Sequence, residues 1–183
     1  LLMSESVSIR DDALADGATG LTFDFEGMPK TPTPLVERGV AIGPVTDSYW
    51  AAKSGRSNTG HALPAPNAHG PLPLDLRMDA GNATVEDMIA AVGRGVYVTR
   101  FHYVNIEDPV RATLTGMTRD GTFLIEGGRL ASPLRNLRFT QSAVDALTHV
   151  LGVSSRRKSV GEEGGTLVPY LLLERFAFTG ETR

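Results

Sequence analysis

Cysteine is absent from the 183 residues of this chain. A disulfide framework, a thiolate nucleophile and a zinc site with sulfur ligands are therefore excluded. Long apolar runs are missing as well, because no window approaches the roughly 18 residues of a membrane-spanning helix. The first residues, LLMSESVSIRDD, lack the basic head and apolar stretch of a signal peptide. These absences favour a cytoplasmic protein.

Strong charge and the common catalytic motifs are also lacking. The net charge of -3 gives no electrostatic reason to seek a phosphate backbone, so we expect neither a nucleic-acid nor a membrane partner. The patterns HExxH, G-x-S-x-G and G-x-x-x-x-G-K-[ST] do not occur. GEEGG at 161–165 has glycines without a strand-to-helix context or a phosphate-binding lysine, so we do not interpret it as a phosphate loop.

What is present indicates an α+β fold. With 41% apolar residues the chain can bury a core, and its length favours one domain over 1–183, with possible subdomains 1–83 and 84–183. The dipeptides Asp120-Gly121 and Gly127-Gly128 are typical of two-residue hairpin turns. We therefore predict a twisted, mainly antiparallel meander over 96–140, joined by a central strand over 168–179.

Capping residues predict short helices beside this sheet. Thr84 and Ser142 each precede an acidic residue and an apolar run, which predicts helices near 84–93 and 142–152. Asp47 is placed to cap a third short helix. Alternation in LTFDFEG predicts a half-buried strand over 21–27, with Leu21, Phe23 and Phe25 facing inward. The Pro-rich stretch 54–75 predicts a long loop, of a length that usually serves function or contacts a partner.

The stretch VYVTRFHYVNIED, residues 96–108, carries the first candidate binding residues. Period-two alternation places Phe101 and Tyr103 on the core face and leaves Arg100 and His102 on the other. If the chain turns back, Asp108 joins them in an anion-binding or catalytic group. The alternative is a solvated or partner-facing surface with one ion pair.

The Pro-rich loop carries the second candidate, His61. Together with His69 it would need at least one more ligand to hold zinc, and the sequence gives no clear third ligand. Asp24 and Glu26 lie two apart and would make a carboxylate pair, although polar residues alternating with apolar ones are also typical of a solvent-facing side. We therefore predict no catalytic and no metal residues in this chain.

Several segments resemble, in order, the C-terminal half of the TldD/PmbA family, also known as candidate modulators of DNA gyrase. They include FDFEGMPKTPTPLVERGV, DSYWAAKSGRSNTGHA, TRDGTFLIEGG and VPYLLLERFAFTG. The most specific parts are D-x-E-G at Asp24 to Gly27, S-x-T-G-H at Ser57 to His61, and TRDGTFLIEGG at 118–128. The resemblance covers nearly everything from Val7 to Gly180.

This resemblance implies a bacterial or archaeal metalloprotease system. In it, TldD-like chains bind zinc through HExxxH in their N-terminal half, with a cysteine from the C-terminal half, whereas PmbA/TldE-like partners lack the metal motif. The present sequence has neither HExxxH nor a cysteine near 153–166. It is therefore similar to the C-terminal domain of a PmbA/TldE-type subunit, with the family's N-terminal half outside these residues.

Three functions follow as hypotheses. The first is a non-catalytic part of a metalloprotease that acts on unfolded peptides or small proteins, including antitoxins. It holds no cofactor itself, works beside a zinc-binding TldD-like subunit, and pairs with that subunit or as a homodimer. The second is a self-sufficient hydrolase that uses histidines and nearby carboxylates. The third is a regulator that binds DNA gyrase, which rests on the family's name alone.

Overall fold

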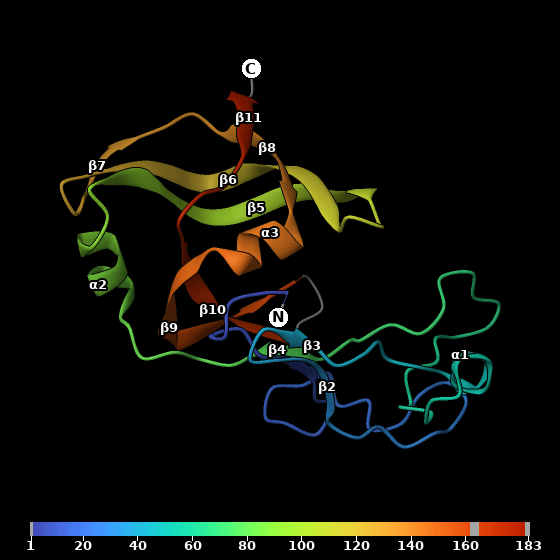
Figure 1. Ribbon diagram of the computed structural model, residues 1–183. Helices are drawn as coiled ribbons and strands as arrows, with labels where there is room; N and C mark the ends of the chain where they lie inside the picture. Colours follow the sequence, from blue (N-terminus) through green and yellow to red (C-terminus); the bar gives the residue numbers. More distant parts are fainter. Residues whose placement is uncertain (1, 162–164, 182–183) are drawn as a thin grey trace. The chain divides into compact units, whose positions relative to one another are not determined.

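The computed structural model describes residues 2–161 and 165–181, which divide between two compact units (Figure 1). Unit 1 contains the described residues of 5–80 and 157–169, and unit 2 those of 2–4, 81–156 and 170–183. The first boundary falls at 80/81, three residues before the subdomain boundary expected from the sequence. The phosphate-loop question at GEEGG concerns residues 162–164, which lie outside the described residues.

Strands dominate the described residues, which also contain three helices, and this confirms the α+β class. The strands and helices of unit 1 are β1 (Ile9–Asp11), β2 (Thr33–Glu37), β3 (Val40–Ala41), α1 (Ser48–Ser54) and β4 (Leu76–Met78). Those of unit 2 are α2 (Val85–Ala90), β5 (Arg94–Asp108), β6 (Thr113–Glu126), β7 (Arg129–Pro133), β8 (Leu137–Ser142), α3 (Ala143–Thr148) and β11 (Phe178–Glu181). The remaining strands, β9 (Val150–Val160) and β10 (Thr166–Leu173), each divide between the two units. None of the helices in the described ranges is long and apolar enough to cross a membrane.

The first sheet has six strands and contains all strands of unit 1 together with β9 and β10. Its strand order is β3-β2-β1-β4-β10-β9, with antiparallel pairs throughout the first four strands and a parallel bridge from Arg77 of β4 to Leu167 of β10. β10 therefore lies in the interior of the sheet, as expected for this apolar segment. The expected single strand over 168–179 is wrong, because β10 ends at Leu173 and β11 joins the other sheet.

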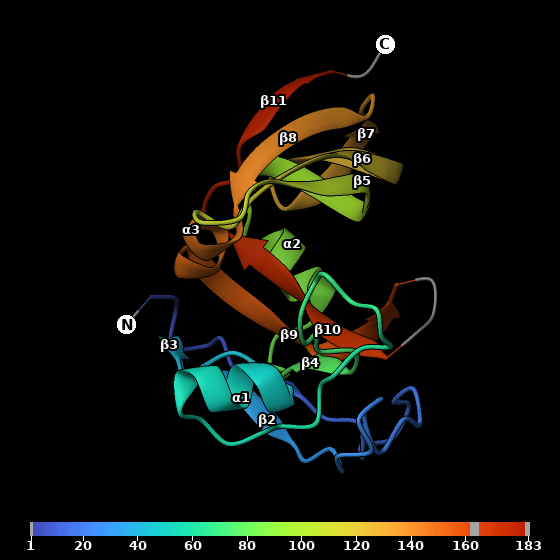
Figure 2. The ribbon, with the colours of Figure 1, turned by 90° about the vertical axis from the view of Figure 1, so that its right-hand side faces the viewer.

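The sheet of unit 2 has the strand order β11-β8-β6-β5, with β7 also paired to β6 (Figure 2). Gly127 and Gly128 form the predicted hairpin turn between β6 and β7, and both have positive φ angles. The turn predicted at Asp120-Gly121 is wrong. These two residues oppose the single residue Thr99 in a β-bulge inside the continuous strand β6. Their positive φ angles serve a bulge as readily as a turn, so the dipeptide alone does not distinguish them.

The helices begin where the capping residues predict. Asp47, Thr84 and Ser142 each accept a hydrogen bond from the backbone N–H three residues ahead. The predicted ends at 93 and 152 are too late, because α2 ends at Ala90 and α3 at Thr148. Residues 150–152 belong instead to β9, where strand pairing prevails over the helical pattern.

Residues 21–27 form no strand, which corrects the sequence-based expectation. Only an isolated bridge joins Phe23 to Pro29. The expected burial is also wrong, since Asp24 is buried whereas Phe23 is 62% exposed and Leu21 and Phe25 are exposed too. The buried carboxylate accepts three backbone N–H groups, and this local bonding outweighs the apolar alternation.

Candidate functional site

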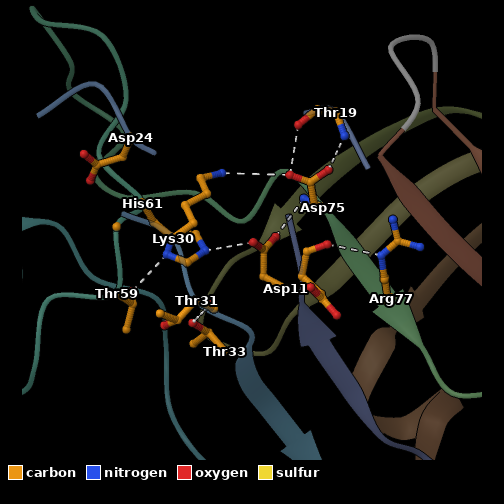
Figure 3. Close-up of polar contacts among 12 residues, drawn as sticks. Asp11, Thr19, Asp24, Lys30, Thr31, Thr33, Thr59, His61, Asp75 and Arg77 are labelled. Atoms are coloured by element: carbon orange, nitrogen blue, oxygen red, sulfur yellow. Dashed lines mark hydrogen bonds and ion pairs between the residues drawn. The ribbon is translucent and has the colours of Figure 1, made fainter. Parts of the chain in front are cut away.

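A network of buried polar residues in unit 1 surrounds His61, which ends the S-x-T-G-H segment (Figure 3). Its side chain is buried, and both ring nitrogens have a partner within the unit. Nε2 lies 2.9 Å from Oδ2 of Asp11, and Nδ1 lies 2.9 Å from Oγ1 of Thr59. Both ring nitrogens are therefore occupied by internal contacts.

Asp11, at the end of β1, connects this histidine to the next buried acid. Its Oδ1 accepts the backbone N–H of Asp75 at 2.7 Å. Burial by itself would raise the pKa of the Asp11 carboxyl. The hydrogen bonds from His61 and Asp75, with the charges of His61 and Lys30, outweigh that effect, so the pKa lies below its ordinary value. Asp11 is therefore held as a carboxylate.

Asp75 is the second carboxylate of the network. It accepts hydrogen bonds from the backbone N–H of Thr19 at 2.6 Å and from the Thr19 hydroxyl at 2.9 Å. The buried ammonium of Lys30 lies 3.9 Å from its Oδ2. Figure 3 shows the side chain of Lys30 extending toward Asp75. The network thus ties the Pro-rich loop and residues 19–30 to β1 and to the segment that leads into β4.

The space beside this network is too small for a substrate. Leu21, Phe23, Lys30 and His61 are among the residues that line a cavity of about 10 Å³, and a cavity of that size holds a single water molecule. The network has the donors and acceptors of acid–base chemistry, but the cavity beside it admits about one water molecule and no larger group. We conclude that it stabilises the fold of unit 1.

The D-x-E-G segment forms a clamp beside the same loop. Asp24 Oδ1 accepts the N–H groups of Glu26 and Met28, and its Oδ2 accepts that of Ala62, which follows His61. Glu26 accepts both the N–H and the hydroxyl of Ser48 at the start of α1. The two carboxylates therefore do not form a catalytic pair. Sequence reasoning overlooked this role, although an aspartate followed closely by glycine is typical of turns stabilised by the side chain.

The candidates on β5 lie in separate contacts. Arg100 pairs with Asp120 on β6 at 2.6 Å, which fits the alternative of an exposed surface with one ion pair. Asp108 accepts the N–H groups of Val110 and Arg111 and so caps the turn into β6. The half-buried ring of His102 stands edge-on to that of Tyr103. The structure therefore does not bring Arg100, His102 and Asp108 together.

The predicted alternation holds only in part at Phe101, which is 40% exposed, and fails at Tyr103. Phe101 packs against the rings of Phe139 and Phe176. Tyr103 is 71% exposed, contrary to the expectation that it faces the core. A bulge between His102 and Asn105 inserts an extra residue opposite β6, and Tyr103 has a φ of 52°. One inserted residue reverses the facing of the side chains that follow, which explains the error.

Among the described residues, the histidines and carboxylates are not gathered into a cluster of zinc ligands. The sequence contains four histidines and no cysteine. His61 is bonded internally, His149 contacts the carbonyl oxygen of Asp145, and His69 is exposed on the loop. Within 2–161 and 165–181, no group of three or more His, Cys, Asp or Glu side chains is arranged to hold a metal ion. The zinc site on His61 and His69 that was weighed from the sequence has no support here, because His61 is bonded to Asp11 and Thr59.

Known proteins share both this sequence pattern and this fold. Residues 1–180 match the profile of the PmbA/TldA metallopeptidase C-terminal domain, and the chain belongs to that family. It is 26% identical over 152 residues to a metalloprotease TldD homolog of Haemophilus influenzae, covering 81% of this chain and 31% of that protein. A metalloprotease of Methanothermobacter thermautotrophicus is 25% identical over 158 residues, covering 84% and 34%. The chain thus spans about a third of the length of these curated relatives.

Two solved structures share the fold. TldE from Thermococcus kodakarensis superposes with a TM-score of 0.82 at 22% identity, covering 98% of this chain and 41% of that one. A candidate modulator of DNA gyrase from Thermotoga maritima also gives a TM-score of 0.82 at 22% identity, covering 97% and 40%. The resemblance noted in the sequence is confirmed at the level of family and fold.

Proposed function

We propose that this domain is a non-catalytic part of a TldD/PmbA-type metalloprotease system of the cytoplasm. It contributes shape and contact surface and acts by association with a metal-binding TldD-like chain or with a second copy of itself. The system cleaves unfolded peptides or small proteins. The zinc ion, in this proposal, is bound by the metal-binding chain.

The observation that carries this proposal is the state of the His61 network. His61 and Asp11 are the residues best suited to acid–base chemistry, and both are buried and bonded to each other. A catalytic site needs convergent groups around a space that admits substrate, whereas the adjoining cavity holds about one water molecule. Membership of the family suggests a role in proteolysis. The domain would then act through contacts that the surfaces of its two units make with other chains.

Reconstitution with a TldD-like chain tests the proposal. The purified domain alone should leave an unfolded peptide intact and should contain zinc far below one ion per chain. Addition of a metal-binding TldD-like chain should produce cleavage that a chelator abolishes. The matched control is the metal-binding chain without this domain, which should cleave more slowly. Near-stoichiometric zinc and peptide cleavage by the isolated domain would instead favour the self-sufficient hydrolase.

A further inference from the structure

An open cleft of about 320 Å³ lies on unit 1, where β1 and β2 pair irregularly. Ile9 lies opposite Val36 but Arg10 lies opposite Pro34, so Leu35 is an extra residue that forms a bulge in β2. Bulges redirect side chains and are common beside binding sites. A cleft of this volume admits a long side chain or another small ligand. We call it the β1–β2 cleft, and it is lined by residues 8–10, 34, 36–38 and 79.

The lining of the β1–β2 cleft is partly apolar. Ile9, Pro34 and Val36 contribute carbon-rich side chains, and charged side chains from the ends of β2 and β4 stand beside them. None of these residues belongs to the His61 network, so the cleft is a separate feature of unit 1. This combination suits a ligand that has an apolar stem and a charged end.

The two arginines of the cleft already have acidic partners. Nη1 of Arg10 pairs with Asp79, and its Nε lies 3.5 Å from Oδ2 of Asp12. Nη2 of Arg38 lies 3.3 Å from Oε2 of Glu5. Both positive charges are therefore compensated within the chain, and an anionic ligand would have to compete with these carboxylates.

Glu37 makes the cleft electronegative. It is exposed at the end of β2, and in the described part of the chain its carboxylate has no ion pair. Around the cleft, two guanidiniums face four carboxylates, those of Glu5, Asp12, Glu37 and Asp79. An excess of negative charge attracts cations. A metal ion is not the expected ligand, since no acidic or histidine side chains within 2–161 and 165–181 are grouped to hold one.

We propose that the β1–β2 cleft binds a basic side chain, lysine or arginine, of an unfolded peptide. The aliphatic stem of that side chain lies along Ile9, Pro34 and Val36, and its cationic end pairs with Glu37. Lysine and arginine combine a long apolar stem with a charged end, which matches both parts of the lining. The inference rests on the proposed function, because it names the class of peptide that the domain holds.

Titration with short peptides, blocked at both ends, tests the ligand class. Each peptide has alanines around one central lysine, arginine, norleucine or glutamate. The lysine and arginine peptides should shift the backbone amide signals of Ile9, Arg10 and Glu37 in a saturable way, as measured by two-dimensional NMR of the unmodified chain. Norleucine supplies the stem without the charge, so its peptide should bind more weakly, and the glutamate peptide should not bind. Added salt should weaken binding of the two basic peptides, because exposed charges are screened.

Glu37→Lys tests the residue that pairs with the cationic end. It places a like charge in the cleft, so binding of the lysine peptide should weaken about tenfold or more. The position is exposed, and the fold should be retained. Asp16→Lys is the matched control, because Asp16 is an exposed acid of unit 1 outside the cleft and the net charge changes equally. This control should bind the lysine peptide as the unmodified chain does.

The outcomes separate this inference from the proposed function. Equal binding of the lysine and norleucine peptides, shifts confined to residues outside the cleft, or equal losses in Glu37→Lys and Asp16→Lys would overturn the cleft assignment. If zinc-dependent cleavage by the metal-binding chain still requires the domain, the proposed function stands without it. Conversely, selective binding of basic peptides at the cleft supports the assignment even where the domain fails to promote cleavage, and in that case the proposed function is the part that is wrong.

Discussion

At the scale of single residues, His61 and Asp11 show how a candidate catalytic histidine becomes a structural one. His61→Ala should leave the Asp11 carboxylate and the Thr59 hydroxyl without their shared partner. Breaking a buried pair on one side costs about 3–5 kcal/mol. Urea unfolding followed by the fluorescence of Trp50, the chain's single tryptophan, measures the loss. His69→Ala, on the exposed part of the loop, is the control and should change stability by less than about 0.5 kcal/mol.

The depressed pKa of Asp11 gives a second residue-scale prediction. Because the folded-state pKa lies below the unfolded value, this carboxylate stabilises the fold above about pH 4, and the stabilisation is lost as the pH falls through the folded-state pKa. The stability difference between the unmodified chain and Asp11→Asn should therefore be largest near pH 5 and shrink toward pH 3. Urea midpoints at stepped pH values measure it. A difference that is constant over this range would contradict the assignment.

At the scale of elements, the β6–β7 turn offers a comparison of adjacent glycines. Gly127 and Gly128 have φ angles of 55° and 76°, which alanine adopts at a cost of about 1–2 kcal/mol. A Cβ on Gly127 meets nothing within 4 Å, whereas one on Gly128 would lie 2.7 Å from the carbonyl oxygen of Ala90. Gly128→Ala should therefore destabilise the chain more than Gly127→Ala, as measured by the free energy of unfolding. Equal losses would show that Ala90 moves aside freely.

Elements also show the limits of sequence patterns. The capping residues placed the three helix starts correctly, because a cap acts through a hydrogen bond to a neighbour three residues away. Local reasoning failed for Asp120-Gly121. Their positive φ angles agree with the predicted turn, but the two residues form a bulge within β6. Whether such a dipeptide turns the chain or forms a bulge depends on which strand lies opposite, and that is a long-range property.

At the scale of the whole molecule, two units share β9 and β10. Residues 150–156 and 170–173 belong to unit 2, and the described residues of 157–160 and 166–169 to unit 1. A strand that unfolds in one unit loses its register in the other, so we expect one cooperative transition. Trp50 fluorescence, which reports on unit 1, and hydrogen exchange of the β6 amides in unit 2 should give the same free energy of unfolding. Different values would show that the units unfold separately.

The sequence by itself determined the properties that act locally or over the whole composition. It established the α+β class, the helix caps, the Gly127-Gly128 turn and the family resemblance, since each depends on neighbouring residues or on the order of segments. Only the tertiary structure decided the facing of Tyr103, the burial of Asp24 and the partners of His61. These depend on bulges and on contacts between residues far apart in the chain: Asp11 and His61 are 50 residues apart, and only folding places them 2.9 Å from each other.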